Sequence, residues 1–226
     1  MKYRLSFLFI LLVFNLSAQE DGFISLFNGK DLSEWKSATE NPQCFSVEGG
    51  VLMVKGGRSH LFYQGPAGID FKNFELKLKV KTLPGANSGV YFHTKYQETG
   101  WPDAGFEAQV NSTHQDPRKT GSLYGIVNIW VLQEEERKIV EVNENGEVFS
   151  HQAAAPSRDN QWFDYHITVK GNKITIRVNG MIQTAWTQPE GWNMGGRKIG
   201  SGTIALQAHD PDSEIHYRDI RIKALE

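Results

Sequence analysis

The sequence contains one cysteine, Cys44, so no internal disulfide can stabilise the fold. A lone cysteine is more often a small buried apolar group than a nucleophile. No basic stretch is interleaved with aromatic residues, and 24 Lys and Arg residues are balanced by 26 Asp and Glu residues. This balance argues against a nucleic-acid partner. The fold must therefore rest on a hydrophobic core, for which about 200 residues are ample.

Long apolar runs are also missing beyond the N-terminus. A short positive start with Lys2 and Arg4 precedes the nearly unbroken apolar run 5–14, and small residues follow up to Ala18. This layout predicts a secretory signal peptide over residues 1–18. The run is shorter than the roughly 20 residues that a membrane span needs, and no cysteine follows it for lipid attachment. We expect an exported protein, periplasmic or secreted, that begins near Gln19 and has no membrane anchor.

Helical periodicity is scarce, whereas period-two alternation recurs between Gly, Asn and Pro turns. The runs 74–80, 163–170 and 174–178 alternate most clearly, and Gly171-Asn172 and Asn179-Gly180 suit tight hairpins. Further strands are expected at 45–47, 51–54, 90–93, 106–110, 127–132, 203–209 and 215–222. This pattern predicts one all-β domain over residues 19–226, a two-sheet antiparallel jelly-roll sandwich of the concanavalin A-like kind, with loops at 100–105 and 188–202.

One expected strand, Gly105-Phe-Glu-Ala-Gln-Val-Asn111, carries an unusual polar face. Alternation places Phe106, Ala108 and Val110 on one side and Glu107, Gln109 and Asn111 on the other. The first set suits a core. The second set combines different polar groups on short side chains, whereas a plain solvated strand usually carries Lys, Thr and Glu. We interpret this face as part of a sugar-binding cleft.

Two other strands offer polar groups to the same cleft. His93 alternates with apolar residues near the motif Asn87-Ser-Gly-Val-Tyr-Phe92, and Gln207 and His209 alternate with apolar residues near the C-terminus. If these faces belong to one sheet, His93, Gln207 and His209 share a cleft with Glu107. The loop 100–105 adds Trp101, whose ring could stack on a sugar.

The usual pair of catalytic carboxylates is absent from the strand. Glycoside hydrolysis normally uses two carboxyl groups that flank the bond, and laminarinase-type sandwiches place theirs on one strand as Glu-x-Asp-x-Glu. Here only Glu107 remains, which disfavours ordinary retaining hydrolysis unless a loop residue such as Asp103 supplies a second acid. The sequence has no H-x-H or H-E-x-x-H motif. Any metal dependence is expected to involve a divalent ion and histidine, chiefly His93 and His209.

Several motifs in order resemble the 3-keto-disaccharide hydrolase family, from about Gly22 to the end of the chain. They are the opening 23–35 and the segments 87–92, 105–109, 120–125, 202–207 and 217–223. The resemblance implies a concanavalin-like jelly roll, export, and action on glycosides oxidised at the sugar 3-position.

The resemblance also suggests a chemistry that one carboxylate can perform. A ketone at C3 acidifies the proton at C2, so a base can remove it and the C1 substituent can leave by elimination; later addition of water gives net hydrolysis. Such a site needs a base, a group for the enolate oxygen and an acid for the leaving group. We expect Glu107 to be the base, and His209 or His93 to be the acid or to hold a divalent metal against the keto oxygen. The expected substrate-binding residues are Asn87, His93, Trp101, Gln109, Tyr124 and Gln207.

Two alternatives remain at the level of the sequence. A non-catalytic, lectin-like sugar-binding module uses similar polar rows and aromatic platforms, and fold does not imply function. A conventional endo-glucanase is the other. A binding module would tolerate Glu107→Gln at a modest cost in affinity, whereas an enzyme would lose most of its activity.

Overall fold

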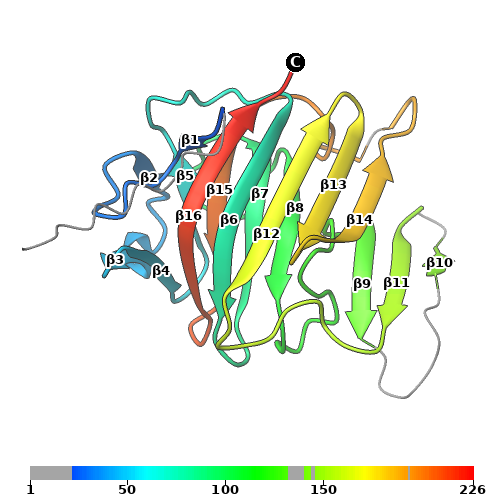
Figure 1. Cartoon of the computed structure of the whole chain (residues 1–226), viewed down its shortest axis with the longest axis horizontal. Coiled ribbons are helices and arrows are strands. Elements are labelled where there is room, and N and C mark those ends of the chain that lie inside the picture. Colours follow the sequence, from blue (N-terminus) through cyan, green and yellow to red (C-terminus); the bar gives the residue numbers. More distant parts are fainter. Residues whose placement is uncertain (1–21, 132–139, 144–145, 193) are drawn as a thin grey trace, which may run out of the picture.

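The structure is a computed structural model that describes residues 22–131, 140–143, 146–192 and 194–226. Its regular structure is almost entirely β-strand (Figure 1). The strands are β1 (Ile24–Ser25), β2 (Trp35–Ser37), β3 (Phe45–Glu48), β4 (Val51–Lys55), β5 (Ser59–Tyr63), β6 (Phe74–Thr82), β7 (Asn87–Thr94), β8 (Phe106–Asn111), β9 (Val127–Val131), β10 (Val140–Val142), β11 (Val148–Gln152), β12 (Phe163–Lys170), β13 (Lys173–Val178), β14 (Met181–Thr187), β15 (Thr203–Ala208) and β16 (Glu214–Ala224). A short 3₁₀ helix, η1 (Pro42–Cys44), precedes β3. The expected signal peptide, residues 1–18, lies outside the described residues and stays a prediction.

Two antiparallel sheets form the sandwich. The large sheet has the order β14-β13-β12-β6-β16-β4-β3, with β1 paired to β16. The small sheet has the order β2-β5-β15-β7-β8 and lies behind the large one in Figure 1. Strands β10, β11 and β9 form a separate three-stranded sheet at one end. The predicted all-β, two-sheet jelly-roll sandwich is confirmed.

The hairpins follow from the turn residues. Lys170 pairs with Lys173 across Gly171-Asn172, and Val178 pairs with Met181 across Asn179-Gly180. Asn179 and Gly180 have φ of 49° and 79°, the left-handed values that a tight two-residue hairpin requires. Asparagine and glycine tolerate these values better than other residues.

The hydrophobic core lies between the two sheets. The large sheet contributes the apolar rows of β6, β12, β13 and β16, and the small sheet contributes those of β7, β8 and β15. Two buried tyrosines join the sheets: the Tyr165 hydroxyl donates to the Gln109 carbonyl at 2.8 Å, and the Tyr217 hydroxyl lies 2.8 Å from Ser88 Oγ. These bonds fix β7 and β8, the strands that carry the expected site, against the large sheet.

Strand β5 gives no alternating signal because all five of its residues, Ser59–Tyr63, are buried. A strand covered on both faces reads as a continuous run, which periodicity does not separate from other buried segments. Strand β14, Met181–Thr187, was not expected either, because its exposed Met181 and Ile182 interrupt the alternation.

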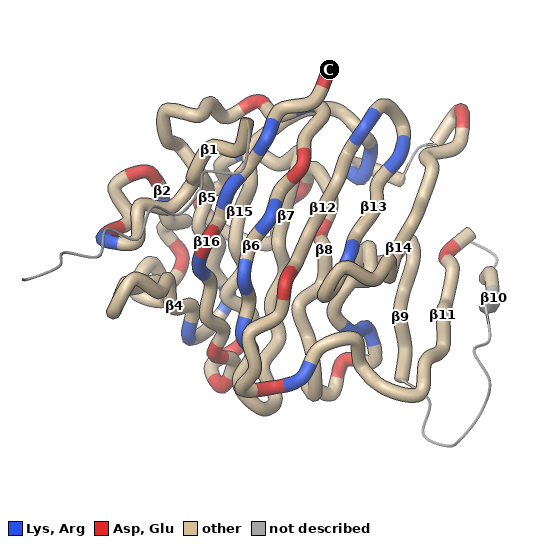
Figure 2. Tube along the Cα trace, viewed as in Figure 1, with Lys and Arg blue, Asp and Glu red and all other residues tan. Residues whose placement is uncertain are grey.

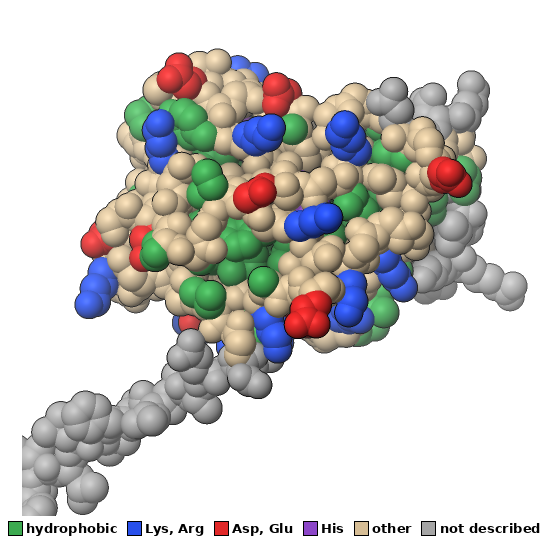
Figure 3. All heavy atoms as spheres, turned by 90° about the horizontal axis from the view of Figure 1, so that it is seen from above, with side chains coloured by type: hydrophobic (Ala, Val, Ile, Leu, Met, Phe, Trp, Pro, Cys, Tyr) green, Lys and Arg blue, Asp and Glu red, His purple; other side chains and the backbone are tan. Residues whose placement is uncertain are grey.

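Charged side chains decorate the outer faces. Lys and Arg residues recur along β6 and β16 (Figure 2), at positions that alternate with buried ones. Seen from above, basic and acidic side chains are spread with hydrophobic ones between them (Figure 3). Among the described residues, no helix has the length and apolar character needed to cross a membrane.

Candidate active site

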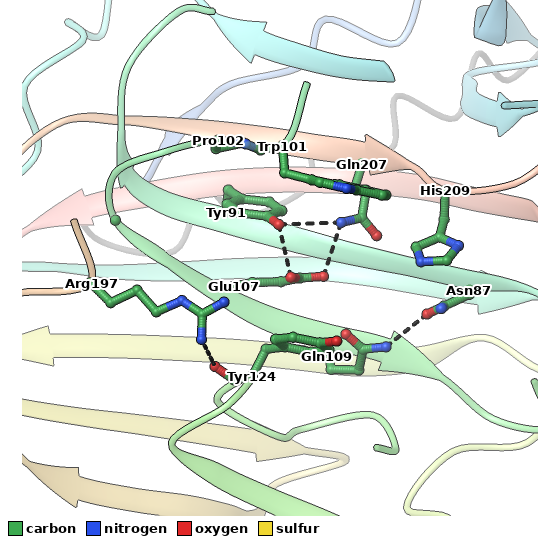
Figure 4. Close-up of a pocket in the computed structure, with 11 residues that line it drawn as sticks. Asn87, Tyr91, Trp101, Pro102, Glu107, Gln109, Tyr124, Arg197, Gln207 and His209 are labelled. Atoms are coloured by element: carbon green, nitrogen blue, oxygen red, sulfur yellow. Dashed lines mark hydrogen bonds between the residues drawn. The ribbon is translucent and has the colours of Figure 1, made fainter. Parts of the chain in front are cut away.

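A pocket of about 220 Å³ lies on the outer face of the small sheet, where three loops meet β7, β8 and β15. Figure 4 shows its side chains converging on a common space. Its lining residues are Asn87, Tyr91, Trp101, Pro102, Gly105, Glu107, Gln109, Tyr124, Arg197, Gln207 and His209. Seven of the eight residues that the sequence assigned to catalysis or substrate binding are thus brought together, and the exception is His93.

Glu107 occupies the middle of this pocket. Its Oε2 accepts a hydrogen bond of 2.8 Å from the Tyr91 hydroxyl, and its Oε1 accepts one of 3.0 Å from the Gln207 amide (Figure 4). Burial raises the pKa of Glu107 to about 7, although these two hydrogen bonds and the charge of Arg197 act in the opposite direction. A carboxylate with a pKa near neutrality is suited to take up and release protons.

The position of Glu107 depends on a missing side chain. Tyr91 pairs with Glu107, and the next outward-facing residue on β7 is Gly89, paired with Gln109. A Cβ at Gly89 would lie 2.3 Å from Glu107 Oε1 and 2.6 Å from its Cγ. Glycine therefore leaves the space across β7 in which the carboxylate reaches Gln207.

We expect Gly89→Ala to displace the Glu107 carboxylate and lower turnover by up to about 10²-fold, since small misplacements of a reacting group have effects of that size. Glu107 would also lose its bond to Gln207, so its apparent pKa should rise. Steady-state kinetics over a range of pH measures both effects. Gly200→Ala is the control, because a Cβ there meets open space. Equal kinetics for the two variants would show that Gly89 does not position Glu107.

Three loops supply the remaining walls. The loop between β7 and β8 brings Trp101, the loop after β8 brings Tyr124, and the loop between β14 and β15 brings Arg197. The guanidinium of Arg197 donates to the Tyr124 carbonyl at 3.3 Å and lies 5.6 Å from the centre of its ring. Figure 4 shows it extending toward Glu107 and Tyr124. Arg197 is the permanent cation among the residues that line the pocket.

Two glutamine side chains of the pocket lining use only their NH₂ groups for hydrogen bonding within the described residues. Gln109 donates its NH₂ group to Asn87 Oδ1 at 2.7 Å, and Gln207 donates to Glu107. Both Oε1 atoms are buried and have no hydrogen-bond partner within the part of the chain that the structure describes. A buried acceptor without a partner costs free energy, on the order of 1–3 kcal/mol. Hydroxyl groups of a bound ligand would remove that cost.

His209 stands at the end of β15, under the ring of Trp101 at 5.3 Å. Within the described residues, His209, Asp210 and His114 place one potential ligand atom each within 4.8 Å of one another. Hydrogen bonds already account for this cluster, however: the Asp210 carboxylate accepts from His209 and from Ser213. No buried polar atom of the three is left without a partner. We therefore assign no step to a metal; that any metal dependence would involve a divalent ion and histidine stays a prediction that chelation tests.

The expectation that His93 shares this pocket is wrong. Its side chain is buried, with Nε2 2.9 Å from the Lys72 carbonyl and its ring 5.7 Å from that of Phe74 in the core. The cause is a bulge in β7: Thr203 pairs with Thr94 but Ala205 pairs with Tyr91, so β7 holds one extra residue. His93 has φ of 55° there. An extra residue breaks the alternation on which the expectation relied.

Two other polar residues that the sequence analysis considered for the cleft, Asn111 and Asp103, do not line the pocket. Asn111 is buried, and its amide donates to the carbonyls of Asp116 and Arg118. It shapes the loop after β8 instead of facing the pocket. Asp103, the candidate for a second acid, is not among the lining residues. Glu107 is thus the one carboxylate in the lining.

The sequence interpretation missed three contributors. Tyr91 was given no role, although its hydroxyl donates a hydrogen bond to the carboxylate. Arg197 belongs to a glycine-rich loop with no pattern to single it out. His60, on β5, packs against two aromatic rings of the pocket lining: its ring lies 5.2 Å from that of Tyr91 and 5.7 Å from that of Trp101. Only the tertiary structure relates these three residues to Glu107.

The fold and the pocket define a jelly-roll protein whose smaller sheet carries a pocket with one buried carboxylate, walled by aromatic and amide groups suited to a sugar. Residues 22–223 match the family described as the 3-keto-alpha-glucoside-1,2-lyase-like domain, so the chain belongs to this family. The resemblance drawn from the motifs is confirmed. Family and pocket together identify a glycoside-acting enzyme.

Individual relatives agree with this assignment. The chain is 23% identical over 239 residues to a 3-keto-disaccharide hydrolase of Bacteroides thetaiotaomicron, covering 93% of this chain and 81% of the relative. Two crystal structures of proteins from Parabacteroides distasonis ATCC 8503, each inferred to be a glycosyl hydrolase, share the fold. One has 23% identity and a TM-score of 0.64, covering 90% of this chain and 99% of its own. The other has 21% identity and a TM-score of 0.62, covering 91% and 94%.

Proposed function

We propose that this enzyme cleaves 3-keto-glycosides by elimination across C1 and C2, followed by addition of water. The proposal rests on the charged groups that line the pocket: one carboxylate, Glu107, and one permanent cation, Arg197. Hydrolysis without a ketone normally needs two carboxyl groups. Removal of a proton next to a ketone needs one base and one group that holds the resulting negative charge.

In the first step, Glu107 takes the proton from C2, and the electron pair of that bond forms an enolate at the C3 oxygen. Negative charge thereby moves from the carboxylate to the substrate. Arg197 reaches into the same pocket and can bind that oxygen as its charge develops. Interactions that strengthen only as charge develops lower the barrier to reaction.

In the second step, the carbonyl re-forms, the electron pair makes a C1–C2 double bond, and the C1–O bond breaks with its electrons. His209, as an imidazolium, gives its proton to the departing oxygen. Addition of water across the double bond then gives net hydrolysis. Gln109 and Gln207 accept sugar hydroxyls through their free Oε1 atoms, Asn87 and Tyr124 position the ring, and Trp101 stacks on it.

The test is incubation of the protein with a 3-keto-glycoside and with the matched unoxidised glycoside, with products followed by mass. We expect cleavage of the ketone alone, with transient formation of a product one water lighter than the sugar. A solvent deuterium label at C2 would record the lost proton. Cleavage of both substrates at similar rates would favour an endo-glucanase, and binding without cleavage would favour a lectin-like module.

The pH dependence of the reaction should report Glu107. The base must be ionised, and its pKa is raised to about 7. We therefore expect kcat/KM to fall as pH decreases through about 7, by up to tenfold per pH unit below it. Tyr91→Phe removes a hydrogen bond that lowers this pKa, so the limb should move to higher pH. A pH profile that stays flat from 5 to 8 in the wild type would contradict this assignment of the base.

A further inference from the structure

Asp210, the residue after His209, is placed to orient the His209 ring. Asp210 Oδ2 lies 2.9 Å from His209 Nδ1 and accepts a 2.8 Å hydrogen bond from Ser213 Oγ. Its other oxygen, Oδ1, accepts from the Asp212 backbone at 3.2 Å. Burial opposes ionisation of Asp210, but the bonds from Ser213 and His209 outweigh it and hold the pKa below its usual value. The carboxylate is therefore ionised and fixed within its turn.

His114 faces the same carboxylate from the loop after β8. The Asp116 backbone N–H donates to His114 Nδ1 at 3.0 Å, so that nitrogen carries no proton. Burial lowers the pKa of His114, which favours the neutral ring. A neutral ring whose Nδ1 accepts must carry its proton on Nε2, and Nε2 lies 3.6 Å from Asp210 Oδ2. His114 therefore presents a proton, not a lone pair, to Asp210.

These assignments fix the tautomer of His209. An ionised carboxylate next to Nδ1 can only accept, so Nδ1 carries a proton. In the neutral ring Nε2 then carries a lone pair, and it gains a proton only when the ring becomes an imidazolium. A buried aspartate acts on a catalytic histidine in the same way in serine proteases.

We propose that Asp210, supported by His114 and Ser213, is the positioning residue that holds His209 with Nδ1 on the carboxylate and Nε2 toward the leaving group. This inference rests on the proposed function for the role of His209 as acid. The hydrogen bonds among His209, Asp210 and Ser213 do not depend on that function, because they are present in the protein without substrate. The same arrangement leaves no lone pair of His114 for a metal ion, because Nδ1 is taken by Asp116 and Nε2 is protonated.

Other charged and titratable groups lie around the His209 ring. His114 and Asp210 lie beside the ring, and His60 lies behind Trp101. Glu107 and Arg197 line the same pocket from β8 and from the loop before β15. Each contributes to the pH profile, so a profile alone does not isolate Asp210, and the test uses the leaving group instead.

The test compares Asp210→Asn with Asp212→Asn on two 3-keto-glucosides. Asp212 is an exposed acid on the same turn, so its variant controls for the loss of one negative charge. One substrate has a sugar as leaving group, which needs protonation, and the other has 4-nitrophenol, which leaves readily as an anion. We expect Asp210→Asn to lower kcat at least tenfold on the first substrate and less than about threefold on the second, as loss of general-acid help predicts. His114→Gln should show the same pattern more weakly.

A purely structural role for Asp210 would lower both rates equally, and this result would overturn the proposal. So would kinetics of Asp210→Asn that match those of Asp212→Asn. ¹⁵N NMR of the histidines tests the tautomer without substrate: we expect the proton of neutral His209 on Nδ1 in the wild type and a mixture of tautomers in Asp210→Asn. A wild-type proton on Nε2 would refute the assignment. If the wild type cleaves neither substrate, the proposed function fails while the NMR result still decides the role of Asp210.

Binding of Mn²⁺ or Zn²⁺ supplies a further check. We expect calorimetry to show no saturable binding that Asp210→Asn and His114→Gln both remove, and full activity after exhaustive chelation. Activity that disappears with the metal and returns on its addition, together with such binding, would replace the hydrogen-bonded arrangement by a metal site.

Discussion

Glu107→Gln lowers turnover of a 3-keto-glycoside by about 10²–10⁴-fold and leaves the fold intact, the size of effect expected for loss of a general base. The amide has nearly the same shape, and its NH₂ group can donate to the Tyr91 oxygen in place of the bond that the carboxylate accepted. What it cannot do is accept the C2 proton. Steady-state kinetics and thermal melting of the purified variant measure the two sides of this expectation.

The matched control is Glu75→Gln. Glu75 is also a strand-borne carboxylate, but it lies on β6 in the other sheet and contacts His166 on the outer face. Its substitution should leave turnover unchanged. Wild-type turnover in Glu107→Gln, with unchanged melting, would show that the base lies elsewhere. His209 would be the next candidate, and the interpretation of β8 as the catalytic strand would be withdrawn.

Arg197→Met should lower kcat by about 10²–10³-fold, the usual consequence of removing one group that stabilises an oxyanion. The developing enolate would then lack the permanent cation of the pocket lining. Because the charge of Arg197 also lowers the pKa of Glu107, the acid limb of the pH profile should move to higher pH in the same variant. Arg197→Lys keeps the charge without the planar fork, so it should recover part of kcat.

Lys198→Met is the control, since Lys198 is the exposed neighbour on the same loop. A variant with raised KM and unchanged kcat would mean that Arg197 binds the ground state and the transition state equally. In that case the enolate would need another partner, and the Tyr91 hydroxyl would be the first to test.

The strands could be predicted where one face is buried and the other is solvated. In β6 and β12, alternation over seven or more residues reflects this asymmetry directly. The predicted run 163–170 has the bounds of β12, and the predicted run 74–80 covers β6 except for its last residues up to Thr82. Strand β5 escaped the same approach because both of its faces are covered. Alternation failed to reveal β5 because it depends on the difference between a buried and a solvated face, which β5 lacks.

The residues of the candidate site could likewise be predicted only where the strand alternates without interruption. Glu107 and Gln109 lie on an unbroken strand, so their common face followed from period two, and the structure places both in the pocket. His93 was assigned by the same rule two residues beyond Tyr91, but a bulge with a left-handed residue intervenes. A bulge depends on how β7 meets β15, which is more than a hundred residues away in sequence.

By itself, the sequence determined the fold class, the hairpins and the strand that bears the carboxylate, because alternation and turn chemistry act between neighbouring residues. The tertiary structure alone decided which groups surround that carboxylate. It brought Arg197 from a loop without pattern, placed Gly89 so that Glu107 could cross β7, and aligned Asp210 with His114. The pKa of Glu107 follows from those surroundings, since desolvation and nearby charge depend on distances in space and not on separation along the chain.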